Sequence, residues 1–393
     1  MKKLIAVLAM VALVSGAAFA QFGGHVIGTV NVLENGHLNS DGDKALGGSA
    51  DLGRIRINGA AENDDGTFGG WLRFDSFNTN VTQGTLTGNS WEGNLLKYID
   101  AFGLVWWKPI QQVKLTIGGN PDGFYEKAGV TTWMFYQMIS DTGVVNPGNA
   151  WGGGYGAMHF RDAFYGGFGG NALMLDIKPI NILGINVILP YFDLGAQDNT
   201  IVDILKAVTA QVDLNLDFGN IAVTYRGDNS DNTNGKLFAY FSLSAIDNLG
   251  IDVGASFTLP GEAPGRAPIN IGLGFKFGAD AFGIKARVAA GLAGTADDDG
   301  NIKLPTTVLA DLLPYYALSD SLRIFASLGL AMEIPDGDAD SVIGFHVNPY
   351  VEIGNEWGPT FYVGFRLWSD GSKDAEDKLN INWKLPIAIG FSF

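Results

Sequence analysis

The C-terminal segment 379–393 alternates strictly between apolar and polar or small side chains. Its odd positions carry the apolar set, namely Leu379, Ile381, Trp383, Leu385, Ile387, Ile389, Phe391 and Phe393. A period of two is that of a β-strand, whose successive side chains point to opposite faces. The pattern predicts one long strand with one apolar face, and Pro386 predicts a gap in its hydrogen-bond ladder or a bulge.

The same alternation returns along the chain, at 208–216, 249–257, 269–277, 282–292 and 322–330. Most of these segments are longer than ordinary strands, which average about five or six residues. Their lengths approach the roughly 9–11 residues that a strand needs to cross an outer membrane. Alternation alone is equally compatible with a soluble β-sandwich, whose apolar faces are buried against each other, so strand length is the first argument for a membrane barrel.

Connections between the predicted strands alternate in length, which is the topology of an outer-membrane barrel. Tight links at 246–248, 278–281 and 318–320 follow longer polar ones at 227–235, 260–268 and 294–304. Further strands are predicted near 22–33, 49–60, 67–75, 98–107, 110–119, 170–177, 184–193 and 206–216. The predicted fold is therefore all-β: a closed antiparallel transmembrane β-barrel of sixteen to eighteen strands, with short periplasmic turns and long external loops.

The composition excludes several classes of function. The chain has no cysteine, which excludes a disulfide scaffold, thiolate metal sites and cysteine catalysis. It has only four histidines and a net charge of −16, which argue against a histidine-rich metal site and against nucleic acid as a partner. We expect no metal and no cofactor. Glycine, at 55 of 393 residues, is about twice the usual 7%. Together with 12% aromatic and only 17% charged residues, this suggests β structure in an unusual solvent.

The N-terminus has the three parts of a secretory signal peptide. Lys2 and Lys3 precede the apolar stretch 4–14, and Ala18-Phe19-Ala20 forms a small-x-small cleavage site. The alternative, a membrane-anchoring helix, would need about 20 apolar residues. We expect residues 1–20 to be the signal peptide and residues 21–393 to be one outer-membrane barrel domain.

Two segments resemble known families. The terminal strand ending in Phe391 and Phe393 resembles the last strand of bacterial outer-membrane proteins, whose final aromatic residue is read by the assembly machinery. The segment Trp106-Trp107-Lys108-Pro109-Ile110, followed by 113–118, resembles a strand–turn–strand of spirochaete (treponemal) outer-membrane porin-like proteins. That resemblance implies passive diffusion of small solutes and transfers no catalytic residue. Aromatic residues near the strand ends are expected in the girdles of the membrane interface, namely Trp71, Trp91, Trp106, Trp107, Trp357, Trp368, Trp383, Phe391 and Phe393.

The polar phase of the strands is expected to line the pore. Its basic members are Arg54, Arg56, Arg73, Lys114, Arg226, Lys276, Lys285, Arg287, Arg323, Arg366 and Lys384. Its acidic members are Asp75, Asp176, Asp213 and Asp252. The alternative is that these charges are simply solvated on a polar face. The wall argues for anions and the acidic loops argue for cations, so the sequence leaves ion selectivity open.

The segment 120–169 is a candidate constriction loop folded into the barrel. It carries Trp151, Tyr155, Phe160, Arg161 and Asp162 among many glycines. The alternative is an external segment or an extra pair of strands.

The sequence favours a porin in the outer membrane that lets small hydrophilic solutes or ions diffuse through a water-filled lumen. The alternative is a non-conducting surface barrel that acts as an adhesin or a structural outer-membrane protein. No spacing of His, Asp and Ser predicts a catalytic site, so we expect no enzyme. The expected partners are outer-membrane lipid, the assembly machinery and small polar solutes, while a homo-oligomer stays open.

Overall fold

The structure is a computed structural model of the chain. It describes residues 19–38, 44–79, 99–120, 170–190, 201–227, 233–260, 269–279, 281–292, 295–296, 302–303, 306–335, 337–338, 340–354, 358–369, 371 and 378–392. Within these ranges nearly every residue belongs to a strand, and one short helix, α6 (Ile201–Lys206), precedes β8. No helix among the described residues has the length and apolar character needed to cross a membrane.

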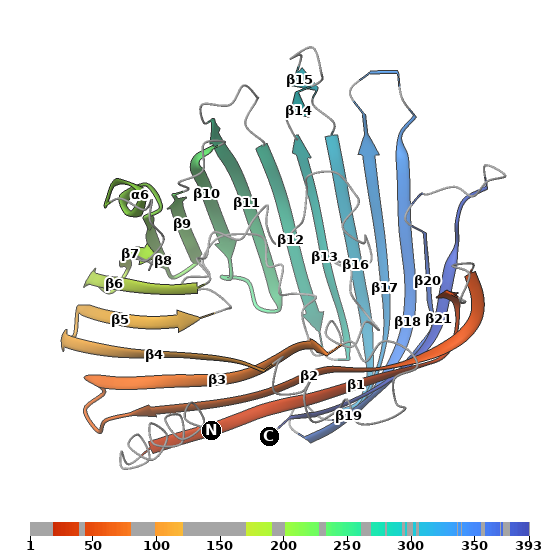
Figure 1. Cartoon of the computed structure of the whole chain (residues 1–393), viewed down its shortest axis with the longest axis horizontal. Coiled ribbons are helices and arrows are strands. Elements are labelled where there is room, and N and C mark those ends of the chain that lie inside the picture. The colour runs from red at the N-terminus through yellow and green to blue at the C-terminus, as the bar shows by residue number, and fades with distance from the viewer. Residues whose placement is uncertain are drawn as a thin grey trace.

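The first half of the sheet runs from β1 to β9, coloured red to green in Figure 1. Its strands are β1 (Phe19–Leu38), β2 (Lys44–Glu62), β3 (Phe68–Thr79), β4 (Ile99–Ile110), β5 (Val113–Asn120), β6 (Gly170–Ile180), β7 (Leu183–Pro190), β8 (Thr209–Leu216) and β9 (Gly219–Arg226). Each strand pairs antiparallel with the next one along the chain, from β1–β2 to β8–β9.

The second half continues the same meander. Its strands are β10 (Thr233–Leu243), β11 (Leu249–Pro260), β12 (Ile269–Ala279), β13 (Phe282–Leu292), β16 (Thr306–Ser319), β17 (Leu322–Ile334), β18 (Val342–Gly354), β19 (Gly358–Gly364), β20 (Arg366–Ser369) and β21 (Asn382–Ser392). The small hairpin β14 (Thr295–Ala296) and β15 (Ile302–Lys303) forms a separate sheet between β13 and β16.

The sheet closes on itself. β1 pairs with β2 on one side and with β21 on the other, so the chain of pairings returns to its starting strand. β19 and β20 both pair with β18 and β21 and are separated only by Phe365, so they are two parts of one strand. The nineteen strands of the sheet are then eighteen around the ring, which confirms the predicted antiparallel barrel of sixteen to eighteen strands.

The two faces of the ring differ in the way that a membrane barrel requires. Along β12 and β13 the apolar residues Ile271, Leu273 and Val288 are exposed. Their neighbours in the opposite phase, such as Arg287 and Ala289, are almost fully buried. A closed ring has only an inside and an outside, so the apolar phase covers the outer face and the polar phase lines the interior, the reverse of a water-soluble barrel.

The connections confirm the predicted alternation of short turns and longer links. Two-residue turns at 111–112, 181–182, 217–218 and 320–321 all lie at one end of the ring, which we call the short-turn end. The longer connections, including the one that carries α6 and the one that carries β14 and β15, lie at the opposite, long-loop end.

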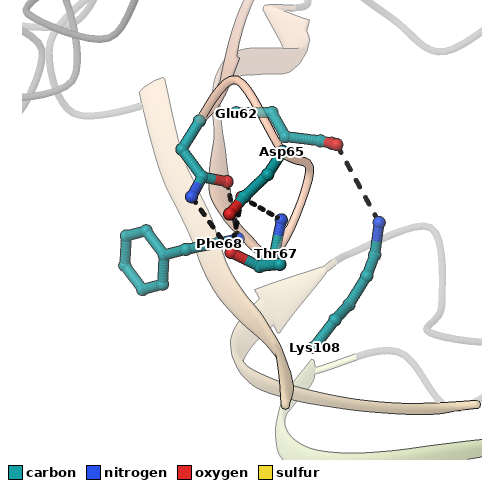
Figure 2. Close-up of polar contacts among 6 residues, drawn as sticks. Glu62, Asp65, Thr67, Phe68 and Lys108 are labelled. Atoms are coloured by element: carbon teal, nitrogen blue, oxygen red, sulfur yellow. Dashed lines mark hydrogen bonds and ion pairs between the residues drawn. The ribbon is translucent and has the colours of Figure 1, made fainter. Parts of the chain in front are cut away.

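The turn 63–67 at the short-turn end shows how local chemistry ends a strand (Figure 2). The Thr67 hydroxyl and the Thr67 N–H both donate to Asp65 Oδ1, at 2.6 and 3.0 Å, and the Phe68 N–H donates to Asn63 Oδ1 at 2.8 Å. These bonds occupy backbone donors that have left the ladder, which is why Asn and Asp favour turns. Gly66 supplies a positive φ of 66°.

Part of the inner wall is packed rather than polar. Near the short-turn end a buried cluster is formed by Leu313, Phe325, Tyr350, Tyr362 and Ala388. The Phe325 and Tyr350 rings stack with their centroids 4.6 Å apart, and Tyr315 tilts against Phe325 at 5.5 Å. These rings stand on neighbouring strands in one row of the ladder, so they lie along the wall.

Candidate functional site

The structure places the predicted basic residues in the inward phase of their strands. Arg56, Arg287, Arg323, Arg366 and Lys384 each lie beside an exposed apolar residue of the outer face. For Arg73, Lys114, Arg226, Lys276 and Lys285, the exposed apolar residues of the same strand lie in the opposite phase, namely Phe68, Ile117, Val223, Leu273 and Val288. Asp176, Asp213 and Asp252 share that inner phase, and Asp213 and Asp252 are buried there. Whether these side chains control permeation stays a prediction.

Several predicted site residues lie wholly or partly outside the described residues. Arg54 pairs with Ile27 and Phe77, and Asp75 pairs with Arg56, but their side chains are not among those described. The candidate constriction residues Trp151, Tyr155, Phe160, Arg161 and Asp162 are not described at all. Of the predicted assembly signal, Phe391 lies on the outer face of β21 as an exposed residue, whereas Phe393 is not described.

Three tryptophans predicted for the membrane interface lie on the inner face instead, so the girdle prediction is wrong for them. Each ring lies beneath a basic side chain, within cation–π distance. Arg73 lies 4.7 Å from the Trp71 ring, Lys114 lies 5.2 Å from the Trp106 ring, and Arg366 lies 4.8 Å from the Trp368 ring. A tryptophan near a strand end can face either way, and only the register decides which. Trp107, one residue further along, does face outward.

The inner wall holds two acids that the sequence analysis missed. Asp311 on β16 and Glu352 on β18 are both buried in the inward phase. Arg287 Nε lies 2.7 Å from Asp311 Oδ2, and Arg323 Nε lies 2.8 Å from Glu352 Oε1. The strand Thr306–Ser319 has leucines on both faces, so it showed no alternation from which Asp311 could be assigned to the lumen. The wall is consequently less basic than predicted.

Five inward cations face an acid across the ladder. Arg56 lies opposite Asp75, Lys114 opposite Asp176, Arg287 opposite Asp311, Arg323 opposite Glu352, and Lys384 opposite Glu34. Three pairs in the same phase join like charges instead: Lys276 with Lys285, Arg226 with Lys236, and Arg366 with Lys384. The pair Arg226–Lys236 lies at the long-loop end, and Lys276–Lys285 lies near the short-turn end.

A Ser, a His and an Asp come together on β16, β17 and β18, a juxtaposition that no sequence spacing revealed. Ser327 Oγ lies 3.1 Å from His346 Nε2. A Cβ on Gly329 would lie 2.5 Å from His346 Nδ1 and 2.7 Å from Asp311 Oδ1, so both atoms border the space that this glycine leaves. No hydrogen bond joins these two atoms, and Ser327 is fully buried, which denies a substrate access to its hydroxyl. The arrangement lacks the geometry of a catalytic triad, and the expectation of no enzyme stays a prediction.

Among the described residues, no group of three or more His, Cys, Asp or Glu side chains could hold a metal ion. The described inner wall carries charged side chains and tryptophan rings, as in the Arg73–Trp71 and Arg366–Trp368 contacts.

Solved structures similar to this chain include a porin and an outer membrane channel. The anion-selective porin from Comamonas acidovorans superposes with a TM-score of 0.53 at 11% identity, covering 95% of this chain and 99% of that one. The outer membrane channel DcaP of Acinetobacter baumannii superposes with a TM-score of 0.50 at 12% identity, covering 96% and 98%. No family model and no curated protein sequence matches the chain. At these identities the likeness concerns the fold, and that fold, together with the apolar outer face and the ring closed by β1 and β21, is the fold of an outer-membrane β-barrel.

Proposed function

We propose that the chain is an outer-membrane porin through which small hydrophilic solutes or ions diffuse passively. The observation that carries this proposal is the distribution of side chains around a closed ring. Apolar residues cover the outside, while charged residues such as Lys114, Lys276 and Arg323 lie inside. A ring of eighteen strands is wider than the eight-stranded barrels whose side chains fill the interior, and it lies in the range of the barrels that leave an aqueous channel.

Localisation in the outer membrane follows from the same distribution. In water the exposed apolar band would favour aggregation, whereas in a bilayer it is the stable arrangement. Within this proposal the segment 1–20 is a signal peptide that is removed on export, and the terminal Phe391 and Phe393 are read by the assembly machinery. We further propose that the segment with Trp151, Tyr155, Phe160, Arg161 and Asp162 would narrow the pore.

We also place the chain with the spirochaete porin-like proteins. The support is the segment that carries the resemblance, 106–118, which forms a strand, a two-residue turn and a strand as β4 and β5. The tryptophan and the lysine of this hairpin, Trp106 and Lys114, stack on the inner wall.

Single-channel recording tests the proposal. The mature chain, refolded in detergent, is added to a planar bilayer, and stable unitary current steps are expected. A heat-denatured sample is the control. Insertion into vesicles, shown by protease protection, without any current would favour a non-conducting barrel. A protein that is folded and soluble in plain buffer without detergent would overturn the membrane assignment.

One observation favours the second candidate, a barrel with a closed lumen that serves as an adhesin or a structural protein. The inward cluster of Leu313, Phe325, Tyr350, Tyr362 and Ala388 is buried, so packed side chains cover part of the inner wall near the short-turn end. The same recording separates the two functions.

A further inference from the structure

The pairing between β1 and β21, which we call the seam, is interrupted partway along the wall. The two strands pair regularly as far as Asn31 and Pro386. The register then shifts, and the next partners are Leu33 and Leu385, so Val32 has no partner in the described seam. An extra residue of this kind is a β-bulge, which disrupts the ladder locally. Pro386 also lacks the backbone N–H that would donate at this level. By contrast, β12 and β13 pair along their whole length without a shift.

The other neighbours of the two seam strands are irregular at the same level. β21 pairs with β19 as far as Ile387 and with β20 at Lys384, so 385–386 has no partner on that side in the described ladder. β1 pairs with β2 at Asn31 and again at Glu34, with a register shift between them. Backbone bonds therefore give this part of the wall less support than a regular ladder would.

A side chain continues the seam beyond the bulge. Toward the long-loop end the register has only two more pairs, the last of which is Glu34 with Lys384. The Trp383 N–H then donates a hydrogen bond of 2.6 Å to Asn35 Oδ1, and Asn35 Nδ2 donates to the Ile381 carbonyl at 3.1 Å. A side-chain amide has the donor and the acceptor of a peptide group. Asn35 therefore bonds to β21 as a further backbone residue of β1 would.

The two bonds of Asn35 satisfy backbone groups that the ladder has left. Nearby residues on the outer face of the seam, such as Leu33 and Leu385, are exposed and apolar, so Asn35 is a polar exception there. Unpaired backbone groups next to an apolar phase are costly, which favours a side chain that pairs them. Two hydrogen bonds of ordinary net strength shift a local opening equilibrium by about tenfold or more.

We propose that the Asn35 amide holds the ring closed at the long-loop end of the seam. Without it, the segment 381–385 separates from β1, and the separation stops at the bulge, where the regular ladder begins. Asn35 is thus a positioning residue for the last strand. The inference concerns the closure of the barrel, and it holds whether or not the barrel conducts.

Hydrogen–deuterium exchange of the refolded barrel in detergent, read by peptide mass, tests the proposal. In Asn35→Ala the amides of 382–385 should exchange about tenfold faster than in the wild type. Asn35→Asp keeps an acceptor for the Trp383 N–H and loses the donor, so its exchange should lie between the two. The matched control is Asn220→Ala on β9, which removes a bond of 3.1 Å from a side-chain amide to the Leu214 carbonyl away from the seam. Exchange at 382–385 that Asn35→Ala leaves unchanged, or that Asn220→Ala accelerates equally, would overturn the proposal.

An engineered disulfide across the seam is the second test, and it also serves if Asn35→Ala does not fold alone. The chain has no cysteine, so Leu33→Cys and Leu385→Cys introduce a single pair. The two positions are direct partners, and such partners on antiparallel strands are close enough for a disulfide. With Asn35→Ala in this background, the oxidised protein should exchange at 382–385 as slowly as the wild type, and reduction should accelerate exchange about tenfold. With Asn35 retained, reduction should change the exchange little. Equal exchange before and after reduction in the Asn35→Ala background would overturn the proposal.

Discussion

Arg287 Nε lies 2.7 Å from Asp311 Oδ2 inside the barrel, and each of the two side chains is 1% exposed. The residues are directly opposite each other on β13 and β16, so the ladder brings their side chains together. A buried ion pair contributes little net stability, because desolvation of both groups offsets their attraction. Loss of one partner is costly, however, because it leaves the other charge buried without its counter-charge.

We expect Asp311→Asn to destabilise the barrel by about 3–5 kcal/mol, because it leaves a buried guanidinium without its counter-charge. The double variant Arg287→Met/Asp311→Leu should recover most of that loss. Urea unfolding of the protein in lipid vesicles, followed by tryptophan fluorescence, measures both. Single and double variants of equal stability would show that the pair is hydrated in the lumen.

A charge on the outer face should be costly. Leu273 lies mid-strand on β12 between Val253 and Val288, and all three are exposed outward. If this band faces lipid, Leu273→Arg should destabilise the folded barrel by about 2–4 kcal/mol. The control is Asn270→Arg on the inner face of the same strand, which forfeits one hydrogen bond of 3.0 Å to Ser256 Oγ. A smaller loss for Leu273→Arg than for Asn270→Arg would contradict the assignment of the faces.

A glycine should be required beneath the aromatic packing. The Tyr315 ring lies over Gly283, and a Cβ there would overlap the ring atoms. Gly283→Ala must displace a ring that also contacts Phe325 at 5.5 Å between centroids, so a loss of about 1–3 kcal/mol is expected. Gly250→Ala on β11 is the matched control, because its nearest contact would be an ordinary 3.6 Å to Lys276 Cβ. The urea unfolding midpoints of Gly283→Ala and Gly250→Ala are compared. Equal midpoints would show that the Tyr315 ring moves aside without cost.

Acid should weaken the turn 63–67. The Thr67 hydroxyl first, and the Thr67 N–H second, hold the pKa of Asp65 below its ordinary value of 3.8. A carboxyl group with a lowered folded-state pKa stabilises the fold fully above the unfolded-state pKa, and that contribution is lost as pH falls through the folded-state pKa. Asp65→Asn should therefore reduce the dependence of stability on pH below about pH 4. The urea midpoints of the wild type and of Asp65→Asn, each measured at pH 6 and at pH 3, test this. An equal change in midpoint between the two pH values for both proteins would exclude a role for Asp65.

The period-two pattern is sufficient to predict the barrel, because every strand of the ring has to be apolar at each second position, where its side chains face outward. The strand 269–277, for example, was predicted within two residues of β12. Helix α6 was not predicted, because six residues are too few to show a helical period. Strand 306–319 was also hard to interpret, because Leu309 and Leu313 are inward residues in a packed wall while Leu312 faces outward.

The inward phase of the charged residues could be predicted from alternation, but their partners could not. Which residue lies opposite Lys285 depends on the register between strands, and no local pattern encodes it. The contact between Trp106 and Lys114 spans a turn whose register is irregular after Trp107, so the sequence suggested a membrane girdle where the structure has an inward stack.

Because β1 and β21 close the ring, the chain could be circularly permuted. His25 pairs with Ser392, so the first and last strands are neighbours although almost the whole chain separates them. A short linker joining these two strands, with new ends cut at the link 261–268, would produce a circular permutant with every ladder intact. In that permutant β11 and β12 become the terminal strands, so the pairing between the two ends of the chain would move from β1 and β21 to the side of the barrel that carries Lys276.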